Sequence, residues 1–265
     1  MNSYDIEMGA ATFHPQTVLS VLENRACRVA FMQPCRRPQD ARGGENPNRL
    51  YKHHQYQVIM MPPPTNIQSM VINSLYECGV DPRKHSIDFV ENNWQSPSMG
   101  AAGKGYEILC NGTEVLPFTY FQQLAGKELD IIPIELAYGT ERLALVSQGK
   151  DHIFDLIWDR VGNNTITYGD VHGVYEKQLC NIQYPANALK AIFNAYEDIC
   201  MSLGALPDLL PAYESFLKLS HTFNLIEASG GLSINERVDL LGRTRKCANE
   251  CLAKFIGGKN DEPNK

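Results

Sequence analysis

Apolar positions along the chain follow two different patterns, and the change between them falls at about residue 150. Before that point, short apolar and β-branched runs predict strands. The runs lie at 28–33, 56–61, 86–91, 106–110, 113–121 and 130–137. Turn signals such as Pro62-Pro63-Pro64 separate them, and Asn111-Gly112 between two alternating runs predicts a two-residue hairpin turn. The first part of the chain is therefore expected to form an antiparallel sheet.

Helical periodicity predicts two helices among these strands, at about 15–24 and 66–78. In the second, Ile67, Met70, Val71 and Leu75 have helical spacing and form one apolar face. After residue 150, a period of about 3.6 residues predicts helices over 186–203, 210–219 and 234–255. We therefore predict an α+β protein, in which residues 1–155 form a sheet domain with flanking helices and residues 156–265 form a helical C-terminal domain.

Composition excludes some classes of protein. The chain has 265 residues, of which 43% are hydrophobic and 20% are charged, as in soluble globular proteins. Its net charge of −6 argues against a protein that binds nucleic acid by itself, because such binding depends on neutralising phosphates. No apolar run approaches the roughly 20 residues that span a bilayer, and no signal-peptide pattern opens the sequence. We predict a cytoplasmic protein that does not bind a membrane.

Cysteine and histidine do not indicate a metal site. The eight cysteines include no Cys-x-x-Cys pair, so the spacing of a zinc ribbon is absent, and we expect reduced thiols. His53 and His54 are adjacent on a predicted strand, where neighbouring side chains point to opposite faces. We therefore predict one inward and one outward histidine rather than a shared metal.

The segment 35–49 is rich in charge and in turn formers, with four arginines, two carboxylates, two prolines and two glycines. It leads directly into the predicted strand at 51–61. Guanidinium groups donate paired hydrogen bonds that match phosphate oxygens, so the segment is a candidate polyphosphate-binding loop. The alternative for such a segment is a solvated charged loop.

Seven short motifs resemble those of the α subunit family of the bacterial heterotetrameric glycyl-tRNA synthetase, a class II aminoacyl-tRNA synthetase. The motifs occur in the family's order and cover nearly the whole chain. They are Gly9-Ala10-Ala11-Thr12-Phe13-His14-Pro15, the arginine loop from Arg36-Arg37-Pro38 to Asn48-Arg49-Leu50, Phe89-Val90-Glu91-Asn92-Asn93-Trp94, Phe118-Thr119-Tyr120-Phe121-Gln122-Gln123, Tyr138-Gly139-Thr140-Glu141-Arg142-Leu143-Ala144, Tyr168-Gly169-Asp170-Val171 and Ser220-His221-Thr222-Phe223-Asn224-Leu225.

The resemblance implies a class II catalytic domain at residues 1–155 and a glycine–tRNA ligase activity. Such an enzyme joins glycine to ATP as glycyl adenylate, with Mg²⁺, and transfers the glycyl group to tRNA-Gly. The family works as an α2β2 assembly with a homodimer of α, and the acidic net charge implies that most tRNA contact comes from the β subunit. Two alternatives stay open: a paralogue that makes an aminoacyl adenylate for a non-tRNA acceptor, and a degenerate nucleotide-binding subunit.

The resemblance also assigns residues to ATP. Arg36 and Arg142 take the catalytic positions, with Arg36 on the α-phosphate and Arg142 on the far side of ATP. For Arg142, the alternative is a surface salt bridge with Glu141. Glu114 is the candidate ligand for Mg²⁺, which favours one or two carboxylates plus phosphate oxygens. The remaining predicted ATP-binding residues are Glu45, Arg49, Gln122 and Tyr56, the last stacking on adenine.

The predicted glycine pocket contains an acidic acceptor, two polar contacts and a wall. Glu135 accepts the ammonium group, and Thr12 and Gln57 are polar contacts. Trp94 excludes any side chain larger than hydrogen by steric clash. The alternative for Trp94 is an ordinary core tryptophan.

The sequence departs from the family's pattern in several places. The family has a helix and a strand before Gly9, part of its homodimer contact, so the chain begins late by comparison. Between residues 92 and 117, Ala102 stands for a tryptophan and Leu116-Pro117 stands for a threonine–glutamine pair. In and after the arginine loop, Gly43 replaces a tyrosine and Lys52 replaces a histidine. These changes bear more on glycine specificity than on ATP binding.

Overall fold

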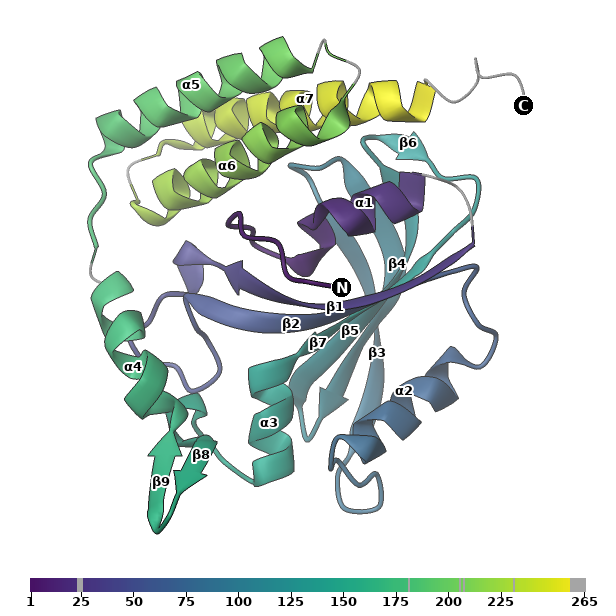
Figure 1. The fold of residues 1–265 in the computed structure, drawn as a ribbon, viewed down its shortest axis with the longest axis vertical. Coiled ribbons are helices and arrows are strands. Elements are labelled where there is room, and N and C mark those ends of the chain that lie inside the picture. Colours follow the sequence, from purple (N-terminus) through teal and green to yellow (C-terminus); the bar gives the residue numbers. More distant parts are fainter. Residues whose placement is uncertain (23–25, 181, 205, 207, 231, 258–265) are drawn as a thin grey trace.

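The computed structural model describes residues 1–22, 26–180, 182–204, 206, 208–230 and 232–257. Within this part of the chain, seven strands form one antiparallel sheet (Figure 1). Six of them lie in the order β1-β2-β7-β5-β4-β3, and β6 pairs with β5. The strands are β1 (Cys27–Arg36), β2 (Lys52–Met61), β3 (Ile87–Ser96), β4 (Ala101–Cys110), β5 (Thr113–Leu124), β6 (Lys127–Glu128) and β7 (Ile134–Gly139). Each predicted strand overlaps one of these, which confirms the predicted sheet.

Strands β4 and β5 form the predicted hairpin and approach each other closely. Asn111 and Gly112 both have positive φ, at 49° and 80°, as a two-residue type I′ turn requires. A Cβ atom on Gly105 would lie 1.9 Å from the carbonyl oxygen of Phe118. Only glycine therefore fits at this position in β4.

Each predicted helical segment overlaps one of the helices, and residues 23 and 24 of the first segment lie outside the described residues. They are α1 (Pro15–Leu22), α2 (Ile67–Glu77), α3 (Thr140–Gln148), α4 (Tyr168–Leu179), α5 (Ala186–Leu203), α6 (Leu209–Ala228) and α7 (Ile234–Gly257), with single turns η1 (Ala11–Phe13), η2 (Pro38–Asp40) and η3 (Ile153–Asp155). α6 continues well past the predicted end at residue 219. None of the described helices is long and apolar enough to cross a membrane.

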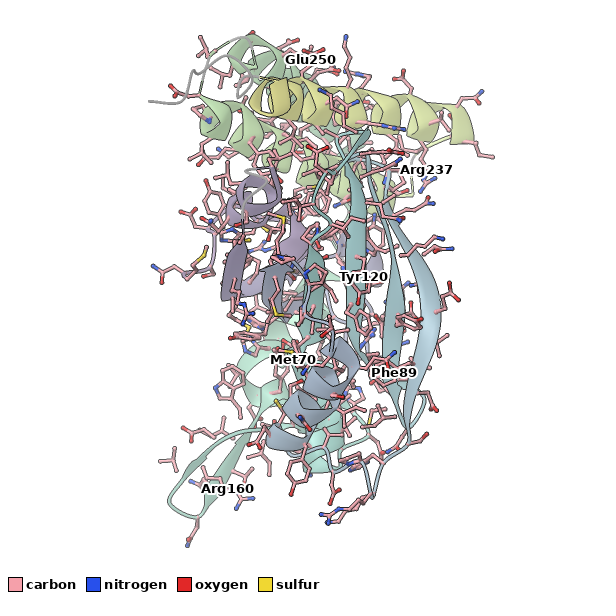
Figure 2. The ribbon with its side chains drawn as sticks, turned by 90° about the vertical axis from the view of Figure 1, so that its right-hand side faces the viewer. Met70, Phe89, Tyr120, Arg160, Arg237 and Glu250 are labelled. Atoms are coloured by element: carbon pink, nitrogen blue, oxygen red, sulfur yellow. The ribbon has the colours of Figure 1, made fainter. Side chains whose placement is uncertain are left out.

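A short hairpin interrupts the region that was predicted to be helical. β8 (Ile157–Val161) and β9 (Asn164–Thr167) pair with each other, and Gly162 between them has φ of 60°. In Figure 2 this hairpin, which carries Arg160, lies at the opposite end of the molecule from α5, α6 and α7. Strands of four or five residues give too short an alternation to be recognised beside the stronger helical periodicity that follows.

The two faces of the sheet differ in polarity. On one face, α2 contributes Val71 and Leu75, which are fully buried against Ile108 and Leu116. On the other face, strand alternation places a group of buried polar side chains. This second face holds the candidate site described below.

Helices α5, α6 and α7 pack together across one end of the sheet (Figures 1 and 2). Phe193 and Phe216 are fully buried among them. The same apolar cluster contains Val18 from α1 and Ala101 from β4, so the helices and the sheet share one core. The division at residue 155 stays a prediction, and the last eight residues of the predicted C-terminal domain lie outside the described part of the chain.

Candidate active site

A cavity of about 240 Å³ opens on the polar face of the sheet. Strands β2, β3, β4, β5 and β7 line it, together with the segment after β1 and the start of α3. Along β2, alternate residues share this face, so His53, Gln55 and Gln57 follow one another at intervals of about 7 Å. The cavity therefore has two ends that are separated along β2, and they differ in chemistry.

Arginine side chains gather at the end of the cavity near His53. Arg37, Arg49 and Arg142 line it. Arg37 Nε donates to the carbonyl oxygen of Gly9 at 2.8 Å. Arg49 pairs with the Asp40 carboxylate at 3.4 Å, and the backbone carbonyl of Asn48 accepts a hydrogen bond from Arg142 Nε at 3.4 Å. Guanidinium groups held in this way provide the charge and the paired donors that a polyphosphate requires.

Glu114, the predicted magnesium ligand, lies at this same end of the cavity. Its Oε2 accepts a hydrogen bond from Arg142 Nη1 at 2.9 Å, so Arg142 pairs with Glu114. Glu107 and Asp40 also line the cavity. Within the described ranges, no group of three or more His, Cys, Asp or Glu side chains is placed to hold a metal. Scattered carboxylates fit an ion such as Mg²⁺, which shares its coordination between protein carboxylates and substrate phosphates.

The other end of the cavity is built around Glu135 on β7, which is only 4% exposed. Thr12 Oγ1 donates to Glu135 Oε1 at 2.6 Å, and the amide of Gln57 donates to the same oxygen. Thr119 lies opposite Glu135 in the pairing of β5 with β7. Two neutral donors therefore fix the orientation of the carboxyl group.

Burial raises the pKa of Glu135 to about 8, against the hydrogen bond from Thr12, which lowers it. The carboxyl group is therefore protonated at neutral pH when nothing else is bound. A cation beside it would reverse this, because an opposite charge favours the ionised form. This end of the cavity is suited to an ammonium group.

Trp94 on β3 lines the cavity and also packs against the shared core. Its ring meets that of Phe121 edge to face, with centroids 5.2 Å apart and an interplanar angle of 82°. The two interpretations of this tryptophan are thus compatible, since the same ring has one side in the core and another on the cavity.

His53 also lines the cavity, whereas the side chain of His54 contacts Glu141 at 2.7 Å and does not line it. Burial, followed by the positive charges of Arg37 and Arg142, holds the pKa of His53 well below its ordinary value. Its buried Nε2 has no hydrogen-bond partner among the described residues. A neutral imidazole with a free ring nitrogen therefore lies among the arginines.

Five of the residues predicted from the resemblance do not line the cavity. One is Gln57, which is bonded to Glu135; the other four are Arg36, Tyr56, Glu45 and Gln122. Arg36 lies 3.9 Å from Glu7, with 39% of its side chain exposed. Tyr56 is 41% exposed and contacts Tyr138 on the face that α2 covers. Glu45 and Gln122 are exposed. Neighbouring residues of a strand point to opposite faces of the sheet. Arg36 and Tyr56 are each one residue away from a position that faces the cavity, so their side chains lie on the other face.

The remaining predicted residues lie together at the site. Thr12, Arg49, Trp94, Glu114, Glu135 and Arg142 line the cavity, and Gln57 is bonded to Glu135. The structure adds Arg37, Asn48 and His53, to which no ligand-binding role was assigned from the sequence. The buried Asn48 Oδ1 and Gln57 Oε1 have no partner among the described residues. Asn48 lines the cavity, so its oxygen is placed to accept a hydrogen bond from a ligand. The sequence offered a signal for His53. Side chains alternate between the two faces of a strand, so His53, four residues from Gln57, lies on the same face of β2.

An arginine-lined end and a buried carboxyl end, on one face of an antiparallel sheet, form the type of site that an aminoacyl-tRNA synthetase needs for ATP and an amino acid. A family model described as the glycyl-tRNA synthetase alpha subunit matches residues 1–260. The chain belongs to this family, whose members are aminoacyl-tRNA ligases that use ATP.

Individual relatives agree with the family match. Over 262 residues the chain is 42% identical to the glycine–tRNA ligase alpha subunit of Coprothermobacter proteolyticus, covering 98% of this chain and 89% of the relative. Two solved structures of pyrrolysyl-tRNA synthetase from Desulfitobacterium hafniense are similar to part of the fold, each at 14% identity. The first covers 57% of this chain and 54% of its own, with a TM-score of 0.40. The second covers 59% and 53%, with a TM-score of 0.38.

Proposed function

We propose that this chain activates glycine with ATP to form glycyl adenylate, as the α subunit of a glycine–tRNA ligase. The observation that carries the proposal is the pairing, within one cavity, of an arginine-lined end with a buried, oriented carboxyl group. These are the groups that a polyphosphate and an α-amino acid require. The membership of the family supports the same reaction.

At the amino-acid end, Glu135 is the proposed acceptor for the glycine ammonium group. The Oε1 atom of Glu135 accepts hydrogen bonds from Thr12 and from the amide of Gln57, which together hold the carboxyl group in place. Trp94 lines the same cavity, and we assign it as the wall of this end. A rigid aromatic wall selects glycine because a larger side chain would clash with it.

At the nucleotide end, the arginines stabilise the charge that develops on the α-phosphate as the glycine carboxylate attacks and pyrophosphate leaves. Such a reaction depends on positioning and electrostatic stabilisation. We assign the role on the α-phosphate to Arg37 rather than Arg36, because Arg37 lines the cavity. His53 replaces Tyr56 as the proposed aromatic contact for adenine, for the same reason.

Mg²⁺ is the proposed metal, with Glu114 as its protein ligand and the phosphates of ATP as its other ligands. When bound, the ion would neutralise part of the phosphate charge. Because Arg142 already pairs with Glu114, the same carboxylate links the arginine to the metal position.

A β subunit is the proposed partner of this chain, in an α2β2 assembly that contains a homodimer of α. The net charge of −6 supports a division of labour in which the β subunit makes most contacts with tRNA-Gly. The proposed compartment is the cytoplasm, where tRNA is charged. The cavity described here would then serve adenylate formation, and transfer to tRNA would require both subunits.

Glycine-dependent exchange of pyrophosphate into ATP tests the proposal. The chain would be assayed alone and with its β subunit, across all twenty amino acids. We expect exchange with glycine only, stronger in the presence of the β subunit, and no charging of tRNA by the chain alone.

Other outcomes would change the assignment. Exchange with a different amino acid would point to the altered region between residues 92 and 117, where Asn92 and Pro117 line the cavity. ATP binding without exchange under any condition would overturn the proposal in favour of a degenerate nucleotide-binding subunit.

A further inference from the structure

The end of β2 that reaches the arginines lacks a strand on one side. β2 pairs with β1 down to Lys52, but its pairing with β7 stops at Gln55 and Gly139. Residues 51–54 therefore extend past the end of β7. This short segment carries His53 into the cavity, and the carbonyl of Tyr51 accepts a hydrogen bond from the backbone N–H of Arg37 at 2.8 Å.

Two buried carboxylates replace the missing strand. Glu176 on α4 accepts the backbone N–H of Tyr51 at 2.8 Å through Oε2 and that of Lys52 at 3.1 Å through Oε1. Glu141 on α3 accepts the backbone N–H of His54 at 3.0 Å. Figure 1 shows α4 beside the ends of β1 and β2 where this happens. The N–H groups of Lys52 and His54, which alternate along the open edge of β2, are thus bonded to side chains instead of a strand, and Glu176 also bonds the N–H of Tyr51.

Glu176 is 2% exposed and does not line the cavity, so it is distinct from the groups that contact substrate. Glu141 lines the cavity and also contacts His54, so its role there is mixed. Charge-assisted hydrogen bonds that backbone N–H groups donate to a carboxylate are about twice as strong as neutral ones. In the described part of the chain, the hydrogen bonds that Glu176 makes near the site are those with the backbone of residues 51 and 52.

We infer that Glu176 is a positioning residue for ATP: by fixing the backbone at Tyr51 and Lys52, it sets the positions of His53 and, through Tyr51, of Arg37. This inference rests on the proposed function. The glycine end of the cavity has its own anchors in Thr12 and Gln57, about 13 Å along β2 from His53. Loss of Glu176 should therefore act on the nucleotide and spare the amino acid.

The test is steady-state pyrophosphate exchange with Glu176→Gln in the α–β complex. Glutamine keeps the size of the side chain but replaces one acceptor oxygen with a donor, which faces a backbone N–H. We expect the KM for ATP to rise on the order of tenfold and kcat to fall, because a small displacement of the reacting groups is costly. The KM for glycine should stay within about twofold of wild type, a split that general unfolding would not produce.

Two further variants make the result decisive. Glu77→Gln makes the same chemical change at an exposed position of α2 and should match wild type. Glu176→Asp keeps the charge and should recover part of the ATP affinity. Amide hydrogen exchange gives a second measurement on Glu176→Gln. Exchange at residues 51 and 52 should accelerate in this variant, while residues 58–60 stay protected.

The experiment distinguishes a failure of the proposed function from a failure of the positioning role of Glu176. If wild type shows no glycine-dependent exchange, the proposed function is wrong. If wild type is active and Glu176→Gln has wild-type KM for ATP, or raises the KM values for ATP and glycine equally, the positioning role is wrong. Should Glu176→Gln fail to fold, Glu176→Asp decides the question by the same split.

Discussion

The protonation of Glu135 should be coupled to the binding of an ammonium group. With a pKa of about 8 in the free protein, Glu135 is a neutral acid at pH 7 and must lose its proton to pair with glycine. We therefore expect the KM for glycine to fall as pH rises from about 6.5 to 8, measured by pyrophosphate exchange at saturating ATP.

The matched variant for this test is Glu135→Gln. It should raise the KM for glycine on the order of 10- to 100-fold and remove the pH dependence, because a charged hydrogen bond is lost. The sign for stability is opposite to that for binding: since the folded pKa is raised, the free energy of unfolding of wild type should fall between about pH 5 and pH 8. A glycine KM that is flat over this range in wild type would contradict the assignment.

Arg37 and Arg36 are adjacent on the chain but lie in different surroundings. Arg37→Lys should lower kcat for exchange on the order of 100-fold, because lysine cannot provide two parallel donors to a phosphoryl oxygen. Arg36→Lys is the matched control and should stay within about threefold of wild type, since Arg36 is half-exposed and does not line the cavity. The reverse ranking of the two variants would restore Arg36 as the catalytic arginine.

At the scale of elements, the β4–β5 hairpin depends on close approach of two strands. Gly105→Ala would bring a Cβ to 1.9 Å from the carbonyl oxygen of Phe118, so the strands must separate. We expect a loss of about 1–3 kcal/mol of unfolding free energy, measured by urea denaturation.

The same substitution has the opposite expected sign in α7. A Cβ on Gly242 meets nothing within 4 Å, and alanine is the better helix former by about 1 kcal/mol. Gly242→Ala should therefore stabilise the protein. Equal effects of the two variants would mean that the strand spacing described here does not limit stability.

Much of this element structure follows from the sequence, and the exceptions have physical causes. Apolar periodicity indicated six strands of the large sheet, α5 and most of α7. It missed β6, α4, the end of α6 and the hairpin of β8 and β9, where short or polar segments carry little periodicity. For the site, the carboxyl end was predictable from the resemblance. At the arginine end, the sequence does not show which of Arg36 and Arg37 faces the cavity, because β1 ends between them and the alternation of strand faces ends with it.

At the scale of the whole molecule, one apolar core joins the three C-terminal helices to the sheet. Phe193 on α5 is fully buried in it, and the guanidinium of Arg243 lies 4.9 Å from its ring centroid. Phe193→Ala should lower the free energy of unfolding by about 3–5 kcal/mol, as large-to-small core changes do. Because Trp94 on the sheet packs against the same cluster, its fluorescence should report the same transition as far-UV circular dichroism.

The measurement is thermal or urea unfolding followed by both signals. Trp158 is 53% exposed, and Trp158→Phe leaves Trp94 as the single fluorescent tryptophan. Two separate transitions, with only the helical signal shifted by Phe193→Ala, would mean that the predicted division at residue 155 separates independent units.

The carboxylates that bond the end of β2 affect which substitutions the sequence can accept at residues 51 and 52. Glu176 bonds the main-chain N–H groups of residues 51 and 52, and every amino acid except proline offers that group at those positions. Mutations there can accumulate while the path of the strand is preserved. Lys52 contributes its backbone N–H to this anchor, so the bond to Glu176 does not depend on the lysine side chain.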